Sequence, residues 1–494
     1  MDHSKSVLAH EKISEHLKRA EYAVAGELFQ TAQKRLKDGK EVIFTNIGNP
    51  HQLGQKPLTY IRHVMALVTS PDLMDHPQAN NMFMSDEIDR ARTYLEKVGG
   101  IGAYSAPNGA EYVRNEVADF IQRRDGYSAS ADQIFLTNGA SEAARYVMRA
   151  MIRGPHDGIL APIPQYPLYS ASVGLYDGTL CGYELHEESG WSLNMAELER
   201  AYNDAQAKGV TVRGMVFINP GNPTGNCLTY DNLVDLVKFC HERNIVILAD
   251  EVYQENVYQS ERPFVSMKKV LNDMGAPYSN ECELISFHSI SKGPYGECGW
   301  RGGYFELVNI DPRTKQEWFK LASINLCPTV PSQVIMGIMV NPPKPGEPSH
   351  ELYFQEHGEI LASMQRRARM ITDTFNSMEG VVCQEADGAM YSFPRVHLPP
   401  GAIQAAKEAG KAPDVFYCLQ LLEETGISTV PGSGFGQAEG TFHIRTTILP
   451  QEEKFAEVCE KLKSFHAGFM ARFQNKEISE NESNKRAKTG IAAI

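Results

Sequence analysis

One segment of the sequence contains a lysine that could act as a nucleophile. Lys292, in FHSISKGPYGECGWRGGY, directly follows an apolar run and is surrounded by small residues. A lysine amine whose pKa is lowered by burial or by nearby cations forms Schiff bases with carbonyl cofactors. Arg301, nine residues further on, and the hydroxyl of Ser289 could bind a phosphate dianion. Taken alone, the segment is also compatible with an exposed lysine in a turn.

A second segment, IVILADEVYQENVY, ends an apolar run at Asp250. A carboxylate at the end of a buried strand needs a cationic partner, because burying it unpaired is costly. A protonated pyridine nitrogen would be such a partner, and a ring that keeps this proton accepts the electrons of a substrate carbanion. Tyr253 could donate to a phenolate oxygen on the same ring. An N-cap for a following helix explains Asp250 about equally well.

Three further segments could complete a site for a phosphorylated pyridine. VFINPGNPTG holds the amide of Asn222 on a rigid turn, within reach of a phenolate oxygen or a substrate carboxylate. In FLTNGASEAARYV, a helix that begins near Ala140 and Ser141 would direct its free amides at a phosphate. Tyr166, between prolines in PIPQYPLY, could lay its ring on a planar cofactor. A structural turn, an N-cap by Ser141 and core packing of Tyr166 are the alternatives, and it is the convergence of all five segments that favours one site.

The pattern of apolar runs predicts the elements that position these residues. From about residue 130 to 330, short apolar runs alternate with longer helix-like segments, which is typical of an α/β domain with a mainly parallel sheet between helices. Loops at the carboxyl ends of parallel strands meet at one crevice, and the candidate residues follow the apolar runs directly. From about residue 350, a long helical pattern and short strand-like runs predict a smaller α+β domain. The predicted units are an arm (1–40), a segment contributing to the small domain (41–100), the large domain (101–345), the small domain (346–474) and a polar tail (475–494).

Composition excludes several classes of protein. The chain has 494 residues, of which 42% are hydrophobic and 22% charged, as in an ordinary globular enzyme. Its formal charge of −13 disfavours nucleic acid or an anionic membrane as partner, because both require a basic face, and no apolar run is long enough to cross a bilayer. The nine cysteines contain no Cys-x-x-Cys pair, so neither a disulfide framework nor a metal site is expected. The N-terminal residues lack the apolar core of a secretory signal, which favours the cytoplasm.

These segments together resemble the fold type I aminotransferases, which use pyridoxal 5'-phosphate, and within them the alanine aminotransferase family. The resemblance covers about residues 42 to 450 and is carried by NIGNPHQLGQKPLT, GAYS, VADFIQRRDG, LTNGASEAA, PIPQYPLY, NPGNPTG, ADEVYQENVY, SISKGPYGECGWRGGY, GAMYSFP, VPGSGFGQ and FHIRTT. The spacing of Lys292 and Arg301 is characteristic of the alanine group. Trp300, before the arginine, and Ala106-Pro107-Asn108, after GAYS, depart from the residues that are usual in this group.

The resemblance implies a role for each matching residue. Lys292 would hold the cofactor as a Schiff base and move the proton between the substrate Cα and the cofactor. Asp250 would hold the ring nitrogen, Tyr253 and Asn222 the phenolate oxygen, and Tyr166 the ring face. The phosphate would be bound by Ala140, Ser141, Ser289 and Arg301.

Three further matches concern the substrate and the subunit contact. Arg445 in FHIRTT would clamp the substrate α-carboxylate in a bidentate fork beside the backbone of Gly48. An isolated arginine late in a strand more commonly forms a surface salt bridge. Tyr104 in GAYS would reach the phosphate of a neighbouring subunit, which implies a homodimer with shared sites and a dimer contact for residues 41–100.

The implied activity is reversible transfer of an amino group between small amino acids and 2-oxo acids. The predicted reaction is L-alanine plus 2-oxoglutarate to pyruvate plus L-glutamate, with two half-reactions on one cofactor. A glutamate:glyoxylate aminotransferase shares the same sequence blocks and is the first alternative. The second is a paralogue that binds the cofactor, turns over slowly and serves regulation.

Overall fold

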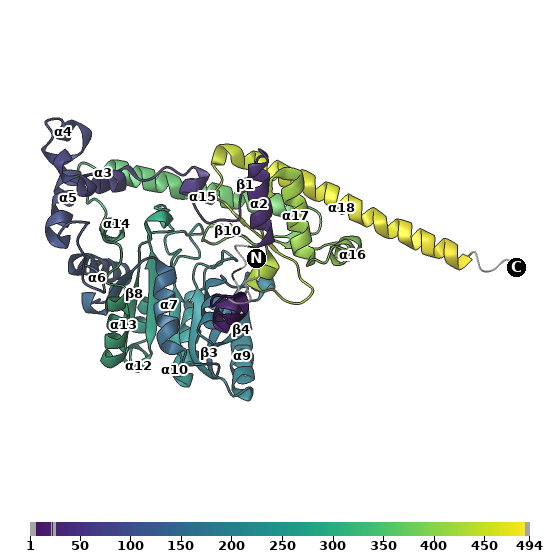
Figure 1. The fold of residues 1–494 in the computed structure, drawn as a ribbon, viewed down its shortest axis with the longest axis horizontal. Helices are drawn as coiled ribbons and strands as arrows, with labels where there is room; N and C mark the ends of the chain where they lie inside the picture. Colours follow the sequence, from purple (N-terminus) through teal and green to yellow (C-terminus); the bar gives the residue numbers. More distant parts are fainter. Residues whose placement is uncertain (1–5, 21, 23–25, 490–494) are drawn as a thin grey trace.

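The structure is a computed structural model that describes residues 6–20, 22 and 26–489, with side chains up to residue 474. Parts of the predicted arm (1–5, 21 and 23–25) and the last residues of the predicted tail (490–494) lie outside the described residues. Two lobes form the body: a large lobe around a seven-stranded sheet and a smaller lobe at the C-terminal end of the chain (Figure 1). No helix in the described part of the chain is both long and apolar enough to cross a bilayer.

The sheet of the large lobe is parallel except for one strand. β8 runs antiparallel to both of its neighbours, and every other pairing in the sheet is parallel. Most of the sheet's residues are buried, as expected for strands covered on two faces. The predicted α/β fold class is therefore confirmed. In spatial order the strands are β2 (Ile134–Thr137), β8 (Gly303–Val308), β7 (Leu284–Ser289), β6 (Val246–Asp250), β5 (Thr211–Ile218), β3 (Asp157–Ile163) and β4 (Thr179–Glu184).

Helices cover both faces of this sheet. One face packs against α7 (Ala140–Met151), α8 (Leu168–Leu175) and α13 (Pro312–Ile324). The other face packs against α9 (Met195–Ala207), α10 (Tyr230–Arg243) and α11 (Met267–Asp273). A further apolar cluster joins the β2 end of the sheet to α3 (Thr59–Thr69), α5 (Ser85–Val98), α6 (Glu111–Asp125) and α14 (Val330–Val340). Much of the predicted segment 41–100 therefore packs on the large lobe.

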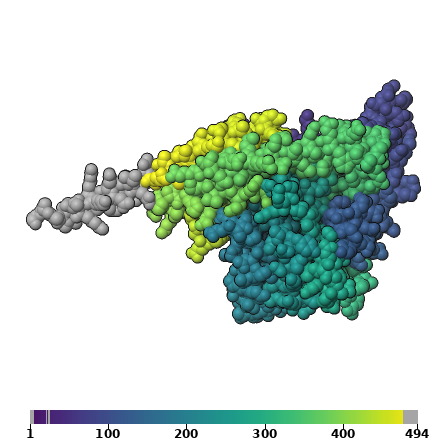
Figure 2. Space-filling model, turned by 180° about the vertical axis from the view of Figure 1, so that it is seen from behind, coloured from purple at the N-terminus to yellow at the C-terminus, as the bar shows by residue number. Residues whose placement is uncertain are grey.

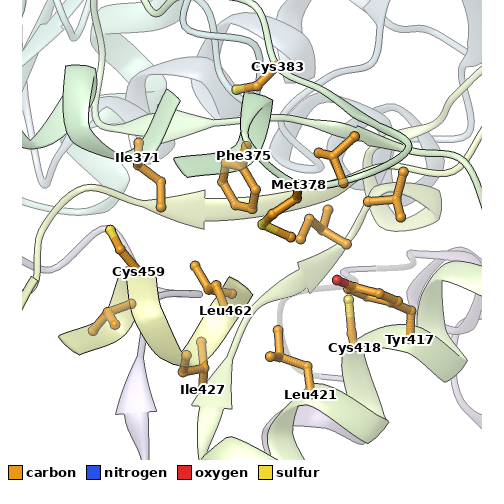
Figure 3. Packing of buried hydrophobic residues seen from close by; sticks show 14 of the residues in the cluster. Ile371, Phe375, Met378, Cys383, Tyr417, Cys418, Leu421, Ile427, Cys459 and Leu462 are labelled. Atoms are coloured by element: carbon orange, nitrogen blue, oxygen red, sulfur yellow. The ribbon is translucent and has the colours of Figure 1, made fainter. Parts of the chain in front are cut away.

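The small lobe has its own core, in which Phe375, Tyr417 and Leu462 meet (Figure 3). Its strands are β1 (Ile43–Phe44) paired with β12 (Ile427–Ser428), β9 (Val381–Val382) paired with β11 (Arg395–Val396), and β10 (Tyr391–Ser392), β14 (Ile444–Thr447) and β13 (Val430–Pro431) in one sheet. The helices around this core are α2 (Glu27–Lys37), α15 (His350–Asn376), α16 (Pro400–Glu408), α17 (Pro413–Thr425) and α18 (Glu452–Thr489). Both the arm, through α2, and residues 43–44 therefore belong to this lobe.

Two long helices, α15 and α18, reach beyond the core of the small lobe. α15 contributes Tyr353 to the core beside α3 and Met364 to the core of the small lobe, so it spans both (Figure 2). α18 extends away from the body, and its backbone stays helical through most of the range predicted as a polar tail (Figure 1). The remaining short elements are α1 (Glu15–Arg19), α4 (Ala79–Met82), α12 (Tyr278–Glu281) and the 3-10 helices His10–Lys12, His51–Leu53, Pro71–Asp75, Ala131–Gln133, Glu187–Ser189, Cys298–Trp300 and Gly432–Phe435.

Candidate active site

A cavity of about 240 Å³ lies between the lobes, at the carboxyl ends of β5, β6 and β7. Strand ends and the segment around Gly48 supply its walls, and β10 and β14 close it from the small lobe. Every residue predicted for the site except Tyr104 lines this cavity, namely Gly48, Ala140, Ser141, Tyr166, Asn222, Asp250, Tyr253, Ser289, Lys292, Arg301 and Arg445. Residues predicted from segments far apart in the sequence thus share one space.

Lys292 is a half-buried side chain inside the cavity, and not an exposed lysine in a turn. Its Nζ donates a hydrogen bond of 3.0 Å to the carbonyl oxygen of Gly48 and lies 5.6 Å from the centre of the Tyr253 ring. A Cβ at position 48 would lie 3.0 Å from this amine and would collide with the hydroxyl of Tyr391. The close approach of the backbone to the amine therefore requires a glycine at position 48.

Asp250 is fully buried at the end of β6 and has no ion-pair partner in the described part of the chain. The hydroxyl of Tyr169 donates to it at 2.6 Å, and the amide of Val252 approaches its other oxygen at 3.4 Å. Burial raises the pKa of this carboxyl to about 6. No helix begins next to Asp250, since the following one, α11, starts at Met267 and is capped by Ser266. The structure therefore excludes the N-cap explanation and leaves a buried carboxylate without a cation.

The first turn of α7 and Arg301 form an end of the cavity suited to an anion. Gly139, with φ of +87°, is the N-cap, so Ser141 lies in the first turn and the N-cap alternative is wrong. Arg301 donates 3.2 Å to Oγ of Ser141 and 3.4 Å to the carbonyl oxygen of Asn138. A Cβ at position 139 would lie 2.5 Å from the guanidinium. The hydroxyl of Ser289 accepts the amide of Ser291 at 2.9 Å and donates to no other group among the described residues, so its hydrogen can serve a ligand.

Arg445 is a buried cation that lines the cavity from β14. Its guanidinium lies 4.4 Å from the centre of the Tyr391 ring and 4.7 Å from that of Phe435. It donates 3.2 Å to Oδ1 of Asn222 and 2.6 Å to the carbonyl oxygen of Asn46, and Nε has no acceptor among the described residues. No carboxylate pairs with it in this part of the chain, so the surface salt bridge is excluded. A buried arginine with a free donor fits an anionic ligand.

Tyr391 is the main residue that sequence reasoning missed. Its hydroxyl lies 2.9 Å from that of Tyr253, and it lines the cavity from β10. Burial opposes its ionisation, but the positive charges of Lys292 and Arg445 outweigh burial and lower the pKa of Tyr391 below its ordinary value. Its segment, AMYSFP, has the pattern of a strand-like apolar run, and although GAMYSFP is one of the blocks that carry the resemblance, no role was assigned to its tyrosine.

Two more tyrosines were missed. Tyr169 holds Asp250, as described above, and a tyrosine in an apolar segment is indistinguishable from a core residue in the sequence. Tyr22, from the N-terminal arm, also lines the cavity, and its hydroxyl lies 2.8 Å from that of Tyr166. No local pattern in the arm indicates such a position.

Tyr104 lies apart from the cavity of its own chain. Its side chain is 76% exposed. An exposed position is required of a residue that reaches a neighbouring subunit, so the role inferred from the sequence stays a prediction.

Comparison with known proteins adds to this geometry. Residues 76–462 match the family model described as aminotransferase class I and II. The chain is 55% identical to glutamate--glyoxylate aminotransferase 1 of Arabidopsis thaliana, covering 95% of this chain and 98% of the relative. It is 50% identical to a probable mitochondrial alanine aminotransferase of Dictyostelium discoideum, covering 96% and 91%. Among solved structures, an alanine aminotransferase from Pyrococcus furiosus superposes with a TM-score of 0.74 at 22% identity, covering 92% of this chain and all of that one, which shows a shared fold.

Proposed function

This chain belongs to the class I and II aminotransferases, and we propose that it converts L-alanine and 2-oxoglutarate reversibly into pyruvate and L-glutamate with pyridoxal 5'-phosphate. The observation that carries the proposal is the shared cavity of the Lys292 amine and the Asp250 carboxylate, with a buried arginine at Arg445 and a second cation at Arg301. This arrangement suits a cofactor that has a cationic ring and a phosphate, with a substrate amino acid bound beside it.

The residues present fit the cofactor at each of its polar groups. When bound, pyridoxal phosphate supplies an aldehyde that condenses with primary amines and a protonated ring that accepts an electron pair from a substrate carbon. Asp250, buried without a cation, is suited to hold the proton on the ring nitrogen. The α7 amides, Ser289 and Arg301 are suited to the phosphate. Arg445 donates to Oδ1 of Asn222. The side-chain NH2 group of Asn222 is therefore suited to donate to the phenolate oxygen, as is the hydroxyl of Tyr253.

The chain's own groups account for binding and proton movement. Arg445 binds the substrate α-carboxylate and so fixes the orientation of the Cα–H bond in the cavity. The amine of Lys292 would take the proton from the substrate Cα and deliver it to the cofactor in the same half-reaction, and it would move a proton in the opposite direction when a 2-oxo acid becomes an amino acid. Tyr391 lies between these two cations and keeps its hydroxyl against Tyr253. Position 48 has no side chain, which leaves room for the amine beside the carbonyl of Gly48.

The direct test uses purified protein loaded with cofactor. Adding L-alanine should release pyruvate in an amount that matches the enzyme, and adding 2-oxoglutarate should then release L-glutamate. Cofactor binding without either product would favour the regulatory alternative.

The glyoxylate alternative is favoured by one observation, the 55% identity to the Arabidopsis enzyme named for that reaction. With L-glutamate as donor, we expect kcat/KM for pyruvate to equal or exceed that for glyoxylate. A preference for glyoxylate of about tenfold or more, equivalent to about 1.4 kcal/mol, would assign the alternative.

Arg445→Lys should weaken capture of every substrate, because a bidentate fork becomes a point charge. Loss of one charge-assisted hydrogen bond corresponds to a fall of about 10- to 150-fold in kcat/KM, which we expect mainly as a rise in KM, for both L-alanine and 2-oxoglutarate. Steady-state kinetics with each substrate checks this. Arg472→Lys, at an exposed arginine paired with Glu424 outside the cavity, is the matched control. An Arg445→Lys variant with the kcat/KM of the control would remove Arg445 from the substrate site.

The assembly and location of the protein belong to this proposal as well. A homodimer is supported by the exposed position of Tyr104, and sedimentation analysis of the loaded enzyme tests it. The cytoplasm is the proposed location, whereas the Dictyostelium relative is named as mitochondrial. Fractionation of cells expressing the full chain would distinguish the two compartments.

A further inference from the structure

The second carboxylate of the proposed dicarboxylate substrates has no obvious cationic partner among the described residues that line the cavity. L-Glutamate and 2-oxoglutarate carry two carboxylates, whereas L-alanine and pyruvate carry one. Among the described residues that line the cavity, the basic side chains are Lys292, Arg301 and Arg445. The proposed function, on which this inference rests, assigns them to the amine chemistry, the phosphate and the α-carboxylate. A distal carboxylate bound by this chain must therefore meet neutral hydrogen-bond donors.

The hydroxyls of Tyr22 and Tyr166 supply such a donor. They lie 2.8 Å apart, with the rings edge to face at 6.3 Å, and both residues line the cavity. Two hydroxyls contain two hydrogens, and the bond between them uses one, so one hydrogen remains for a ligand. Tyr22 is 43% exposed, whereas Tyr166 is half-buried and interacts electrostatically with Arg445. This places Tyr22 at the outer side of the pair, away from the buried α-carboxylate clamp.

Tyr22 is held there by an attachment outside the cavity. α1, which ends at Arg19, packs on α8, whose first residue follows Tyr166 by two positions. Arg19 Nη1 lies 3.3 Å from Oδ1 of Asp177, just beyond α8, and Nδ1 of His16 lies 3.4 Å from the same oxygen. The arm and the ring of Tyr166 are therefore fixed to the same helix.

We propose that Tyr22 determines specificity for dicarboxylates by donating its hydroxyl hydrogen to the distal carboxylate of L-glutamate and 2-oxoglutarate. Tyr166 donates to Tyr22 in turn, which strengthens the outer hydroxyl as a donor. A hydrogen bond to a charged acceptor corresponds to about 10- to 150-fold in affinity. Substrates with one carboxylate do not reach this hydroxyl and gain nothing from it.

The experiment compares Tyr22→Phe with the unmodified enzyme, both loaded with cofactor. The probes are glutarate and pentanoate, unreactive acids of equal chain length that differ in the second carboxylate. Calorimetric titration should show glutarate binding weakened by about tenfold or more and pentanoate binding changed by less than about twofold. The kcat/KM for L-glutamate should fall in parallel, and that for L-alanine should stay within about twofold. Tyr230→Phe, at an exposed tyrosine that donates to Asp273 and does not line the cavity, is the matched control.

The outcomes separate this inference from the proposed function. An unmodified enzyme that fails to transaminate L-alanine defeats the proposed function, whatever glutarate does. An active unmodified enzyme in which Tyr22→Phe weakens glutarate and pentanoate equally, or neither, overturns the role of Tyr22. The second result would assign the distal carboxylate to another donor, such as one from a second copy of the chain.

Discussion

Replacing Lys292 with alanine is expected to lower the rate of L-alanine transamination by at least about 10⁴-fold, the upper range for loss of a positioned proton-transfer group. The amine lines the cavity and lies 3.0 Å from the carbonyl oxygen of Gly48. The other lining residues carry no primary amine, so none can replace it as a nucleophile. Product formation from L-alanine and 2-oxoglutarate, followed over hours, checks the rate.

Cofactor retention separates chemistry from binding in this variant. Asp250, Arg301 and the first turn of α7 remain in place, so Lys292→Ala should still hold pyridoxal phosphate after gel filtration, although without a covalent bond. Lys292→Arg is the informative partner variant, because it keeps the positive charge but cannot lose a proton near neutral pH. Both variants should be equally inactive. Activity within about tenfold of the unmodified enzyme in either would mean that another group moves the proton.

The success of the sequence prediction for this site has a structural reason. Asp250 and Ser289 are the last residues of β6 and β7, which are adjacent parallel strands, and Lys292 follows β7 by three residues. Parallel neighbours bring their carboxyl ends together, so the apolar runs alone predict that these side chains share one edge. The same reasoning places Ala140 and Ser141 at this edge, because they come shortly after β2, and β2 runs in the same direction as β7.

The residues that the sequence did not reveal depend on packing between distant segments. Tyr391 lies on β10, and its position follows from antiparallel pairing with β14, the strand that carries Arg445. Strands of two residues have too little pattern to predict such a register. Tyr22 reaches the cavity only because α1 packs on α8, more than a hundred residues away.

The strand order and the lobe assignment also separate into features that local sequence predicts and features that it does not. Alternating apolar runs predict a parallel sheet, but nothing local indicates that β8 is inserted between β2 and β7 in the opposite direction. The segment 41–100 was predicted to contribute to the small domain and to a dimer contact, and β1 pairs with β12 of the small lobe, whereas α3 and α5 lie in the cluster of α6 and α14. An amphipathic pattern predicts that one face of a helix is buried, but it does not identify the surface against which that face packs.

Asp250→Asn is expected to lower kcat by about 10²- to 10³-fold, the range for removing one preorganised electrostatic group from an active site. The amide keeps the shape and can still accept the hydroxyl of Tyr169, which bonds Asp250 at 2.6 Å. It cannot balance a positive charge on the ring nitrogen. Steady-state rates with saturating L-alanine and 2-oxoglutarate measure this effect.

The same substitution should have the opposite effect on the stability of the cofactor-free protein. Burial raises the pKa of Asp250 from 3.8 to about 6, so the folded state disfavours the charged carboxyl, and this cost grows as pH rises from about 4 through 6. Asparagine carries no such cost. Between pH 4 and pH 8, the free energy of unfolding of Asp250→Asn should therefore rise relative to that of the unmodified protein by about 2 kcal/mol.

Urea titrations of both cofactor-free proteins at several pH values measure this difference. Pyridoxal phosphate should reverse it, because the ring cation then pairs with the buried carboxylate and stabilises only the unmodified protein. A stability difference that does not depend on pH would mean that Asp250 is not a buried carboxyl with a raised pKa in the cofactor-free protein, and its electrostatic role would be withdrawn. The pH dependence therefore tests the electrostatic role of Asp250 independently of turnover.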